Sequence, residues 1–436
     1  MRRTVGVVSL GCAKNRIDTE QMLGLLRAGG WEITADPAQA EAIIVNTCGF
    51  IDPAKQESID TLLEMAQYKK SGRCRVLAAT GCLVQRYAAE LREQMPEVDL
   101  LMGVSDYPQI CSLLSRAFLG ERPVAVGCSR DVFEAPRVLT TAPFSAFVRT
   151  GDGCDNRCAY CAIPLIRGGY RSRPYERVLA EARELSQRGV REITYIAQDT
   201  TRFGDDLPQG NLATLLRDTA RLEGVHWVRA LYCYPTRVDD ALLDALCGDE
   251  KICAYLDLPL QHIDGRILRR MNRKGTPEEI RALIGRVRSR GITLRTTMIV
   301  GFPGETEDDF RRLLDFVAET RFDRLGAFVY SAEEGTPAAQ MEDQVPQEVA
   351  QERLDRLMTL QQGISLSLNR ARVGSVCEAL LEGRDESGRW LARTRQEAPE
   401  GDGRVILTPD ASHRAGEFVK ARITGADTYD LTGEIL

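Results

Sequence analysis

Three cysteines stand close together in the middle of the chain, at a spacing suited to binding iron. Residues 153–161 read Gly-Cys-Asp-Asn-Arg-Cys-Ala-Tyr-Cys, so Cys154, Cys158 and Cys161 form the pattern C-x3-C-x2-C. Thiolates on so short a loop can each bind one iron of a four-iron cluster, and the fourth iron then lacks a protein ligand. That iron is open to a further ligand, and Tyr160 would cover one side of the cluster.

A zinc site, or three unrelated free thiols, is the alternative interpretation of this loop. Structural zinc sites use four ligands, often from C-x2-C pairs. No fourth Cys or His lies near the motif, and the only histidines are His226, His262 and His413. The spacing therefore favours an iron–sulfur cluster.

A second set of three cysteines is spread over the first hundred residues. Cys12, Cys48 and Cys82 each follow an apolar run that predicts a buried strand, and each has a glycine beside it. Because the carboxyl ends of parallel strands share one edge of a sheet, the three are expected to lie together. Glycine lets the backbone approach a bulky centre closely. The pattern predicts a second cluster with an open iron; packing of small cysteines at strand ends is the alternative.

The chain before residue 144 divides into a domain, which must position Cys12, Cys48 and Cys82, and a linker. Residues 1–120 alternate short apolar runs with amphipathic stretches, which predicts an α/β domain built on a parallel sheet. The expected strands are 4–10, 42–46, 75–79 and 98–102. Residues 121–143 contain three prolines and little periodicity, so we expect a linker there.

The rest of the chain predicts two further domains. Residues 144–370 contain six expected strands with helical patterns between them, at 144–150, 192–197, 227–232, 255–260, 294–300 and 325–330. Six such units suit a partial or complete (β/α) barrel, and a doubly wound sheet is the alternative. Residues 371–436 contain short β-rich runs broken by Gly, Asp and Pro, which predicts a small antiparallel β-barrel.

The composition is that of a globular protein without a membrane segment. A hydrophobic share of 43% and a charged share of 28% exclude disordered and fibrous classes. No apolar run approaches the roughly 20 residues of a membrane span, and the first residues lack a signal-peptide pattern. Thirteen cysteines, an odd number, argue against a disulfide framework. We therefore expect a cytoplasmic protein with no membrane contact.

The charge argues against stable nucleic-acid binding. The formal net charge is −6, and residues 372–436 carry nine basic and twelve acidic side chains, a net −3. Proteins held to nucleic acid through phosphates are usually basic in at least one domain. The tail is better suited to a basic protein partner.

Several stretches resemble the radical S-adenosylmethionine methylthiotransferases, and the likeness covers essentially the whole chain. Besides the six cysteines, the matching stretches are 9–15, 46–51, 80–87, 255–262, 301–306 and 328–336. Within that family these stretches are similar to those of the branch that modifies an aspartate of the twelfth small-subunit ribosomal protein. The resemblance implies a partial (β/α)6 radical core and a carboxyl-terminal barrel of the type called TRAM.

The resemblance also implies the cofactors, two [4Fe-4S] clusters and S-adenosyl-L-methionine. Cys154, Cys158 and Cys161 would hold the cluster whose open iron binds S-adenosylmethionine, which one electron cleaves to a 5′-deoxyadenosyl radical. Cys12, Cys48 and Cys82 would hold an auxiliary cluster that carries the sulfur. The radical would take hydrogen from the β-carbon of the aspartate, where the methylthio group is delivered.

No catalytic residue is implied beyond these six ligands. The implied partners are the basic ribosomal protein and a low-potential electron donor such as flavodoxin or ferredoxin.

Other residues have weaker signals. Gly301, Gly304 and Glu305 follow an expected strand at the reactive face of a barrel and could shape the S-adenosylmethionine pocket. A plain strand-to-helix turn, with Thr306 as N-cap and Asp309 as its partner, is the alternative.

Histidine and arginine side chains are expected to be structural. His262 is expected to be a hydrogen-bonded core residue. Three arginines after the cysteine loop are expected to be solvated or ion-paired, and a later basic run is expected to be a solvated helix face. The first set is Arg167, Arg171 and Arg173, and the second is Arg266, Arg269, Arg270, Arg273 and Lys274.

Two other functions stay open at this point. One is methylthiolation of an adenosine in transfer RNA, which the acidic tail disfavours. The other is a non-catalytic iron–sulfur electron carrier or RNA-binding scaffold. Carriers normally saturate a cluster with four protein ligands, whereas each set here has three.

Overall fold

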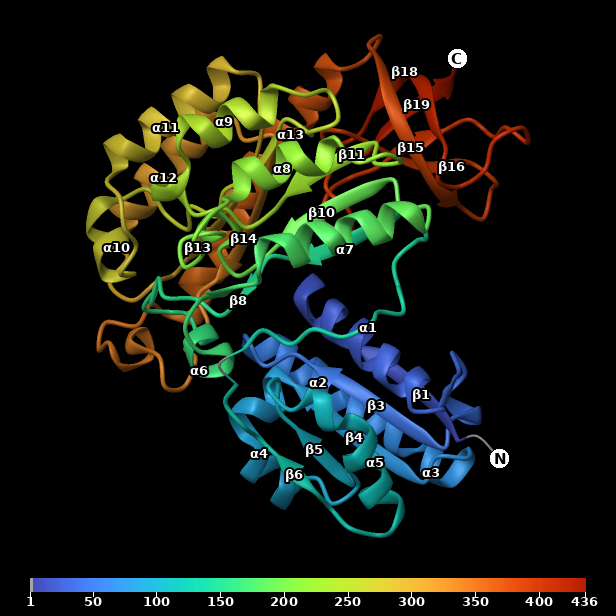
Figure 1. Cartoon of the computed structure of the whole chain (residues 1–436). Coiled ribbons are helices and arrows are strands. Elements are labelled where there is room, and N and C mark those ends of the chain that lie inside the picture. Colours follow the sequence, from blue (N-terminus) through green and yellow to red (C-terminus); the bar gives the residue numbers. More distant parts are fainter. Residues whose placement is uncertain (1–2, 130) are drawn as a thin grey trace.

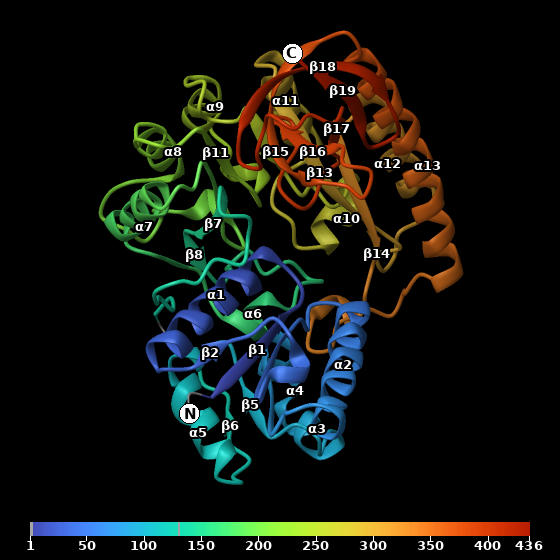
Figure 2. The ribbon, with the colours of Figure 1, turned by 90° about the vertical axis from the view of Figure 1, so that its right-hand side faces the viewer.

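The computed structural model describes residues 3–129 and 131–436, which form three parts that follow one another along the chain (Figure 1). In this view the amino-terminal part lies at the bottom, and the central strand-and-helix part and the carboxyl-terminal barrel lie side by side above it. Turning the molecule shows helix α1 at the boundary between the first two parts (Figure 2). Among these residues, no helix has both the length and the apolar character that crossing a membrane requires.

The amino-terminal part is a six-stranded sheet in the order β2-β1-β3-β4-β5-β6, with every neighbouring pair parallel. Its strands are β1 (Thr4–Ser9), β2 (Glu32–Ile33), β3 (Ala42–Thr47), β4 (Val76–Gly81), β5 (Leu100–Met102) and β6 (Val124–Ala125). Its helices are α1 (Ala13–Ala28), α2 (Asp52–Ala66), α3 (Tyr68–Ser71), α4 (Cys82–Gln94) and α5 (Ile110–Phe118). Every residue of β3 and β4 is buried, as expected of central strands in a parallel sheet covered on both faces.

Two separate apolar clusters cover the two faces of this sheet. One contains residues of α1 and α5, such as Met22 and Leu114, and the other contains residues of α2 and α4, such as Leu62 and Leu91. The expected α/β domain with a parallel sheet is confirmed.

The stretch expected to be a linker contributes the last strand of that sheet. β6 lies within it and pairs in parallel with β5, and a run of two residues is too short to be recognised from its pattern. The chain then follows α1 closely, because a Cβ at Gly24 would collide with the carbonyl oxygen of Pro136. The domain boundaries themselves stay a prediction.

The central part is a six-stranded partial barrel. β7 (Ser145–Arg149), β10 (Glu192–Ile196) and β11 (Trp227–Ala230) form one parallel sheet, and β12 (Tyr255–Asp257), β13 (Thr293–Val300) and β14 (Arg324–Val329) form another. A parallel bridge from Val228 to Ile252 joins the two. The strands thus follow chain order from β7 to β14 and leave the barrel open between these two, which confirms a partial barrel rather than a doubly wound sheet.

Helices on the outside and a short ribbon complete this part. The helices are α6 (Ile163–Arg167), α7 (Tyr175–Gln187), α8 (Leu212–Ala220), α9 (Asp240–Cys247), α10 (Gly265–Arg270), α11 (Pro277–Ser289), α12 (Glu307–Thr320) and α13 (Gln347–Ala371). The ribbon pairs β8 (Gly151–Asp152) with β9 (Arg171–Ser172) in antiparallel fashion.

The carboxyl-terminal part is a closed five-stranded barrel in the order β15-β16-β17-β19-β18. Its strands are β15 (Val376–Arg384), β16 (Trp390–Thr394), β17 (Val405–Leu407), β18 (Phe418–Ala426) and β19 (Leu431–Ile435). The pairing is antiparallel except between β17 and β19, which run parallel. The expected small barrel is confirmed, with this one parallel pair added.

One apolar cluster joins all three parts. Phe147, Trp227 and Tyr255 lie on the inner face of the partial barrel, because the residues next to them in each strand belong to the outer core. Ile17 of α1 and Leu380 of β15 pack against these inner residues. The amino-terminal and carboxyl-terminal parts therefore both pack against the inner face of the central partial barrel.

Candidate iron–sulfur site

Cys154, Cys158 and Cys161 line a single cavity of about 310 Å³. Cys158 is buried, and the other two are partly exposed. Leu165 of the adjacent helix α6 and the distant residues Gly335, Thr336 and Pro337 complete the lining. The short spacing thus produces the shared site that the sequence predicts, at the end of the barrel where the first strand leads out.

The backbone holds this cysteine loop at several points. The loop begins from the β8–β9 ribbon, and the N–H of Cys154 donates to the carbonyl oxygen of Gly168 at 3.1 Å. The N–H of Ala159 donates to the carbonyl oxygen of Met271 at 2.8 Å. Gly153 has a φ of 75°, and a Cβ there would collide with the carbonyl oxygen of Gly169, so this turn requires glycine.

Burial makes Cys154 and Cys161 costly to ionise as isolated groups. It raises the pKa of Cys154 to about 11 and that of Cys161 to about 12, with the neighbouring Cys158 adding to both effects. A bound metal ion reverses this preference, because it stabilises the thiolate directly. In residues 3–129 and 131–436, no three His, Cys, Asp or Glu side chains lie close enough together to bind a single metal ion. Three soft sulfur donors around one cavity fit a cluster.

Cys12, Cys48 and Cys82 also come together, at the carboxyl edge of the amino-terminal sheet. Cys12 follows β1 and is exposed, whereas Cys48 follows β3, Cys82 begins α4, and both are buried. A Cβ at Gly11 would lie 2.9 Å from the Cβ of Cys48. A Cβ at Gly49 would lie 3.0 Å from the carbonyl carbon of Cys82. The glycines therefore permit this close approach. The sequence predicts it only because the carboxyl ends of parallel strands share one edge of a sheet.

The buried thiols of this group have raised pKa values. Burial raises the pKa of Cys48, and it raises the pKa of Cys82 to about 12 although the cation of Arg167 opposes the effect. The charge of Cys12 raises both pKa values further, as expected of three sulfurs in one place. This donor set also fits a cluster that neutralises the thiolates.

Buried arginines connect this edge to the cysteine loop of the barrel. Arg167 of α6 donates to Asp18 of α1 at 2.6 Å and to Asn15 at 3.0 Å, and the thiol of Cys82 lies 3.5 Å from the same Asn15 oxygen. Arg167 also pairs with Asp152 at 3.1 Å. The side chains of Arg167 and Asp18 are only 2% and 1% exposed, so the expected ion-paired role of Arg167 is confirmed.

Removing Arg167 should destabilise the junction strongly. Arg167→Met removes the nearer cation from Asp152 and the only cation bonded to one oxygen of Asp18 among the described residues. We expect the free energy of the first unfolding transition to fall by about 3 to 5 kcal/mol. Urea titration of the apoprotein, followed by circular dichroism, measures the change. Arg171→Met is the matched control, because Arg171 bonds mainly to backbone carbonyls and lies 3.8 Å from Asp152. Equal losses in the two variants would contradict the expectation.

A second ion pair joins the same two parts. Glu333, after β14, accepts from Arg86 of α4 at 2.6 Å and from Lys55 of α2 at 2.8 Å. Arg86 also donates to the carbonyl oxygen of Gly49 at 2.8 Å. Residues 335–337 of the same segment line the cavity of the cysteine loop. One short segment therefore contacts the surroundings of both cysteine groups.

Gly301, Gly304 and Glu305 are not among the residues that line this cavity. A Cβ at Gly301 would collide with Ala350 of α13. The carboxylate of Glu305 accepts from the N–H of Gly301 at 3.1 Å and from Arg353 at 2.8 Å. These contacts make the loop a support, and its role toward S-adenosylmethionine stays a prediction.

The alternative interpretation of that loop is confirmed at its helix. Thr306 caps α12 with its side chain accepting from the N–H of Asp309, while the carboxylate of Asp309 accepts from the N–H of Thr306. His262 is fully buried and its Nδ1 accepts from the N–H of Asp264 at 2.9 Å, which confirms a core role.

Arg273 is a site residue that sequence reasoning missed. The basic run was expected to be a solvated face, and this is wrong for Arg273 because its guanidinium turns inward to Cys158, at 3.8 Å from the sulfur. Helical periodicity could not reveal this, since Arg273 lies after the end of α10 in a loop whose direction is set by tertiary contacts.

A side chain of the amino-terminal part also reaches into the barrel. The ammonium of Lys14, two residues after Cys12, lies 3.0 Å from the ring centre of Tyr232 and is buried. Burial lowers the pKa of Lys14 to about 8, opposed by the charges of Cys12 and Asp257. The edge that carries Cys12, Cys48 and Cys82 therefore faces the inside of the partial barrel.

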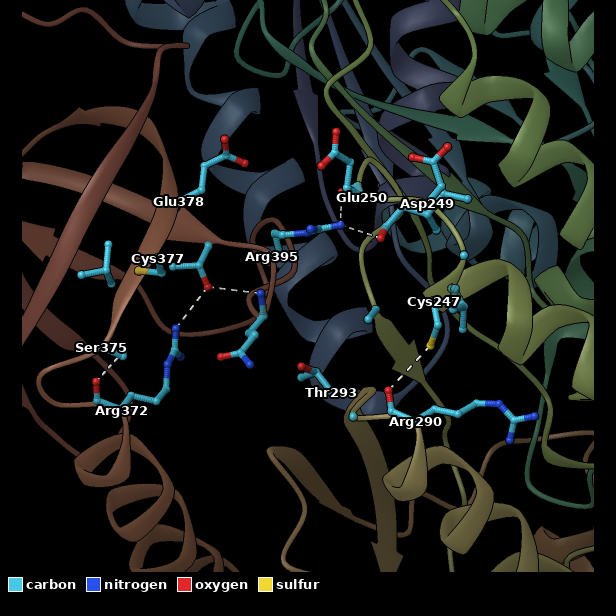
Figure 3. Close-up of a pocket in the computed structure, with 18 of the residues that line it drawn as sticks. Cys247, Asp249, Glu250, Arg290, Thr293, Arg372, Ser375, Cys377, Glu378 and Arg395 are labelled. Carbon is cyan, nitrogen blue, oxygen red and sulfur yellow. Dashed lines mark hydrogen bonds between the residues drawn. The ribbon is translucent and has the colours of Figure 1, made fainter.

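A larger cavity, of about 1000 Å³, lies elsewhere, between the carboxyl-terminal barrel, the end of α9 and the residues just before β12 and at the start of β13 (Figure 3). Cys247 and Cys377 lie on opposite walls, and Arg395 points across the cavity and donates to the carbonyl oxygen of Ile252 at 2.8 Å. The cavity is at the opposite end of the strands from the cysteine loop. We assign it no function.

Family models match most of the chain in three segments. The model described as "Radical SAM superfamily" matches residues 148–317, "Uncharacterized protein family UPF0004" matches residues 4–103, and "TRAM domain" matches residues 373–436. The cysteine loop falls within the first of these segments, and Cys12, Cys48 and Cys82 fall within the second.

Curated relatives match over almost their full length. The chain is 48% identical to "Ribosomal protein uS12 methylthiotransferase RimO" of Heliobacterium modesticaldum, covering 99% of this chain and 95% of the relative. It is 49% identical to the protein of the same name from Desulforudis audaxviator, covering 99% and 97%. The Geotalea uraniireducens protein of that name is 46% identical, covering 100% and 99%.

A solved structure shares the fold. The radical S-adenosylmethionine methyltransferase TsrM of Kitasatospora setae, with cobalamin and a [4Fe-4S] cluster bound, superposes with a TM-score of 0.54. The match covers 95% of this chain and 84% of TsrM at 15% sequence identity. At that identity the similarity concerns the fold alone.

Proposed function

Because this chain belongs to the family of ribosomal protein uS12 methylthiotransferases named RimO, we propose that it adds a methylthio group to the β-carbon of an aspartate of uS12. The chain is a radical S-adenosylmethionine enzyme that methylthiolates this ribosomal protein. We further propose that two clusters, each held by three cysteines, carry out this reaction. The observation that carries this proposal is the single cavity lined by Cys154, Cys158 and Cys161.

These three cysteines would hold a [4Fe-4S] cluster with one iron open to S-adenosylmethionine. When bound, the cluster supplies the one-electron cleavage of S-adenosylmethionine that yields a radical able to take hydrogen from an unactivated carbon. The chain supplies three sulfur ligands and a tightly held loop. A C–H bond without acidic character offers nothing to a general base, which explains why no acid–base pair is needed here.

Cys12, Cys48 and Cys82 would hold a second cluster, the source of the transferred sulfur. The close approach permitted by Gly11 and Gly49 supports one shared site. Both cysteine groups lie beside the junction held by Arg167 and Glu333. The side chains at this junction therefore fix the edge that carries Cys12, Cys48 and Cys82 against the segments around the cysteine loop of the barrel, and the burial of Arg167 and Glu333 keeps water away from these ion pairs.

We propose a low-potential donor such as flavodoxin or ferredoxin as the electron source. The acidic carboxyl-terminal part, with a net charge of −3, supports docking of a basic ribosomal protein. Transfer RNA as the substrate would require a surplus of basic side chains there.

The decisive assay offers both substrates to one enzyme preparation. We expect the anaerobically reconstituted protein, with S-adenosylmethionine and dithionite, to add a methylthio group to an aspartate of uS12 and leave transfer RNA unchanged. Mass spectrometry of uS12 peptides and of digested transfer RNA nucleosides detects each product. An uS12 variant with the target aspartate replaced by asparagine is the control. Modified transfer RNA beside unmodified uS12 would refute the proposal.

A further inference from the structure

The loop between α10 and α11 closes over the cysteine loop of the barrel. Its Met271 accepts from the N–H of Ala159 at 2.8 Å, and Asn272 donates through its side-chain amide to the carbonyl oxygen of Arg157, also at 2.8 Å. Asn272 has a φ of 52° and Arg157 a φ of 51°, so both residues sit in tight turns at this contact. The two loops are thus fixed against each other at the backbone.

Arg273 occupies the centre of this contact. One guanidinium nitrogen lies 3.8 Å from the sulfur of Cys158 and 3.5 Å from the hydroxyl of Tyr160. The other terminal nitrogen donates to the carbonyl oxygen of Pro259, and the guanidinium carbon lies 4.4 Å from the ring centre of Tyr234. Contacts on several sides therefore hold the cation beside one cysteine sulfur.

The charge of Arg273 has no carboxylate partner among the described residues, unlike the charges of Arg266 and Arg270. Arg266 pairs with Asp309, and Arg270 pairs with Asp343 at 2.5 Å. The groups that face Arg273 are a thiol, two phenols and a carbonyl oxygen. Among these neighbours in the described part of the chain, the sulfur of Cys158 is the one that becomes anionic when it binds a cluster.

We propose that Arg273 is a positioning residue that donates to the Cys158 sulfur and thereby favours the reduced state of a cluster bound there. Hydrogen bonds to cluster sulfurs and local charge set the reduction potential of such clusters. Reduction adds one negative charge, and a fixed cation close by stabilises the reduced state more than the oxidised state. One electron enters from the low-potential donor and no bond forms or breaks. The inference rests on the cluster assigned above to Cys154, Cys158 and Cys161.

A redox titration of the isolated central cluster tests this. The parent is the full chain with Cys12, Cys48 and Cys82 replaced by alanine, so that one cluster gives the signal. Into it we place Arg273→Gln, Arg273→Lys and, as the matched control, Arg269→Gln, because Arg269 lies exposed on α10. Iron per chain and the midpoint potential, followed by electron paramagnetic resonance, are measured for each.

We expect Arg273→Gln to keep its iron and to hold the electron about tenfold more weakly, a shift of about 59 mV to lower potential for one electron. Arg273→Lys keeps the charge but loses the planar fork, so its midpoint should lie between those of the parent and of Arg273→Gln. Arg269→Gln should match the parent.

Three other results would overturn the inference. Equal midpoints in the parent and in Arg273→Gln, with equal iron, would show that Arg273 does not tune the cluster. Loss of iron from both Arg273 variants, with unchanged circular dichroism, would show that the residue is a structural clamp. A parent that binds no iron would refute the cluster assignment itself, and this distinguishes failure of the proposed function from failure of the inference alone.

Discussion

Replacing Cys154, Cys158 and Cys161 together with alanine is expected to abolish formation of 5′-deoxyadenosine and to lower the iron content from about eight to about four per chain. The three sulfurs line one cavity, so their loss removes the whole ligand set of one cluster. Without this cluster the enzyme has no site at which S-adenosylmethionine is cleaved. Anaerobic reconstitution followed by iron and sulfide analysis, and chromatography of the nucleoside product, measures both effects.

The matched control replaces three other cysteines with alanine. Cys111, Cys247 and Cys377 are not fully buried and lie outside both groups. This variant should keep about eight irons and full cleavage, since each predicted cluster keeps its ligands. A central triple variant that keeps about eight irons would contradict the assignment of its ligands.

Replacing Cys12, Cys48 and Cys82 with alanine should separate the two halves of the reaction. We expect about four irons per chain, continued formation of 5′-deoxyadenosine, and no methylthiolated uS12 above background, because only the sulfur source is lost. The same iron and nucleoside analyses, with mass spectrometry of uS12, measure these effects. The buried positions change little in volume from Cys to Ala, so the sheet should remain folded.

Two outcomes of this experiment would contradict the second cluster. Methylthiolated uS12 formed by the variant would show that the sulfur comes from elsewhere. About four irons in the unmodified chain, falling to none in the central triple variant, would show that the amino-terminal cysteines are structural.

Much of the site followed from sequence where a local rule applied. The strands of the barrel were predictable because runs rich in apolar and β-branched residues, such as 294–300, stand out from the helical patterns around them. Cys12, Cys48 and Cys82 could be placed together because the edge of a parallel sheet is a topological property, independent of side-chain detail.

The remainder depends on contacts between distant segments. The carboxylate of Glu305, whose role toward S-adenosylmethionine stays a prediction, accepts from Arg353, 48 residues further along the chain. Arg273 belongs to a run whose other arginines pair with carboxylates or face solvent, and only the fold turns it toward Cys158. No periodicity encodes either contact, because each is made by a loop whose path is fixed by packing.

The segment that joins Glu333 to Pro337 places a constraint on chain length. Glu333 is fixed to Arg86 beside the amino-terminal cysteine group, and Pro337 lines the cavity of the cysteine loop in the barrel. Four peptide units join Glu333 to Pro337. An inserted or deleted residue would therefore shift one of these two contacts relative to the other. Insertions between these two contacts should therefore be excluded, while they remain permissible in exposed turns such as 385–389 of the carboxyl-terminal barrel. In this enzyme the count of residues between two contacts is as much a functional requirement as their identity.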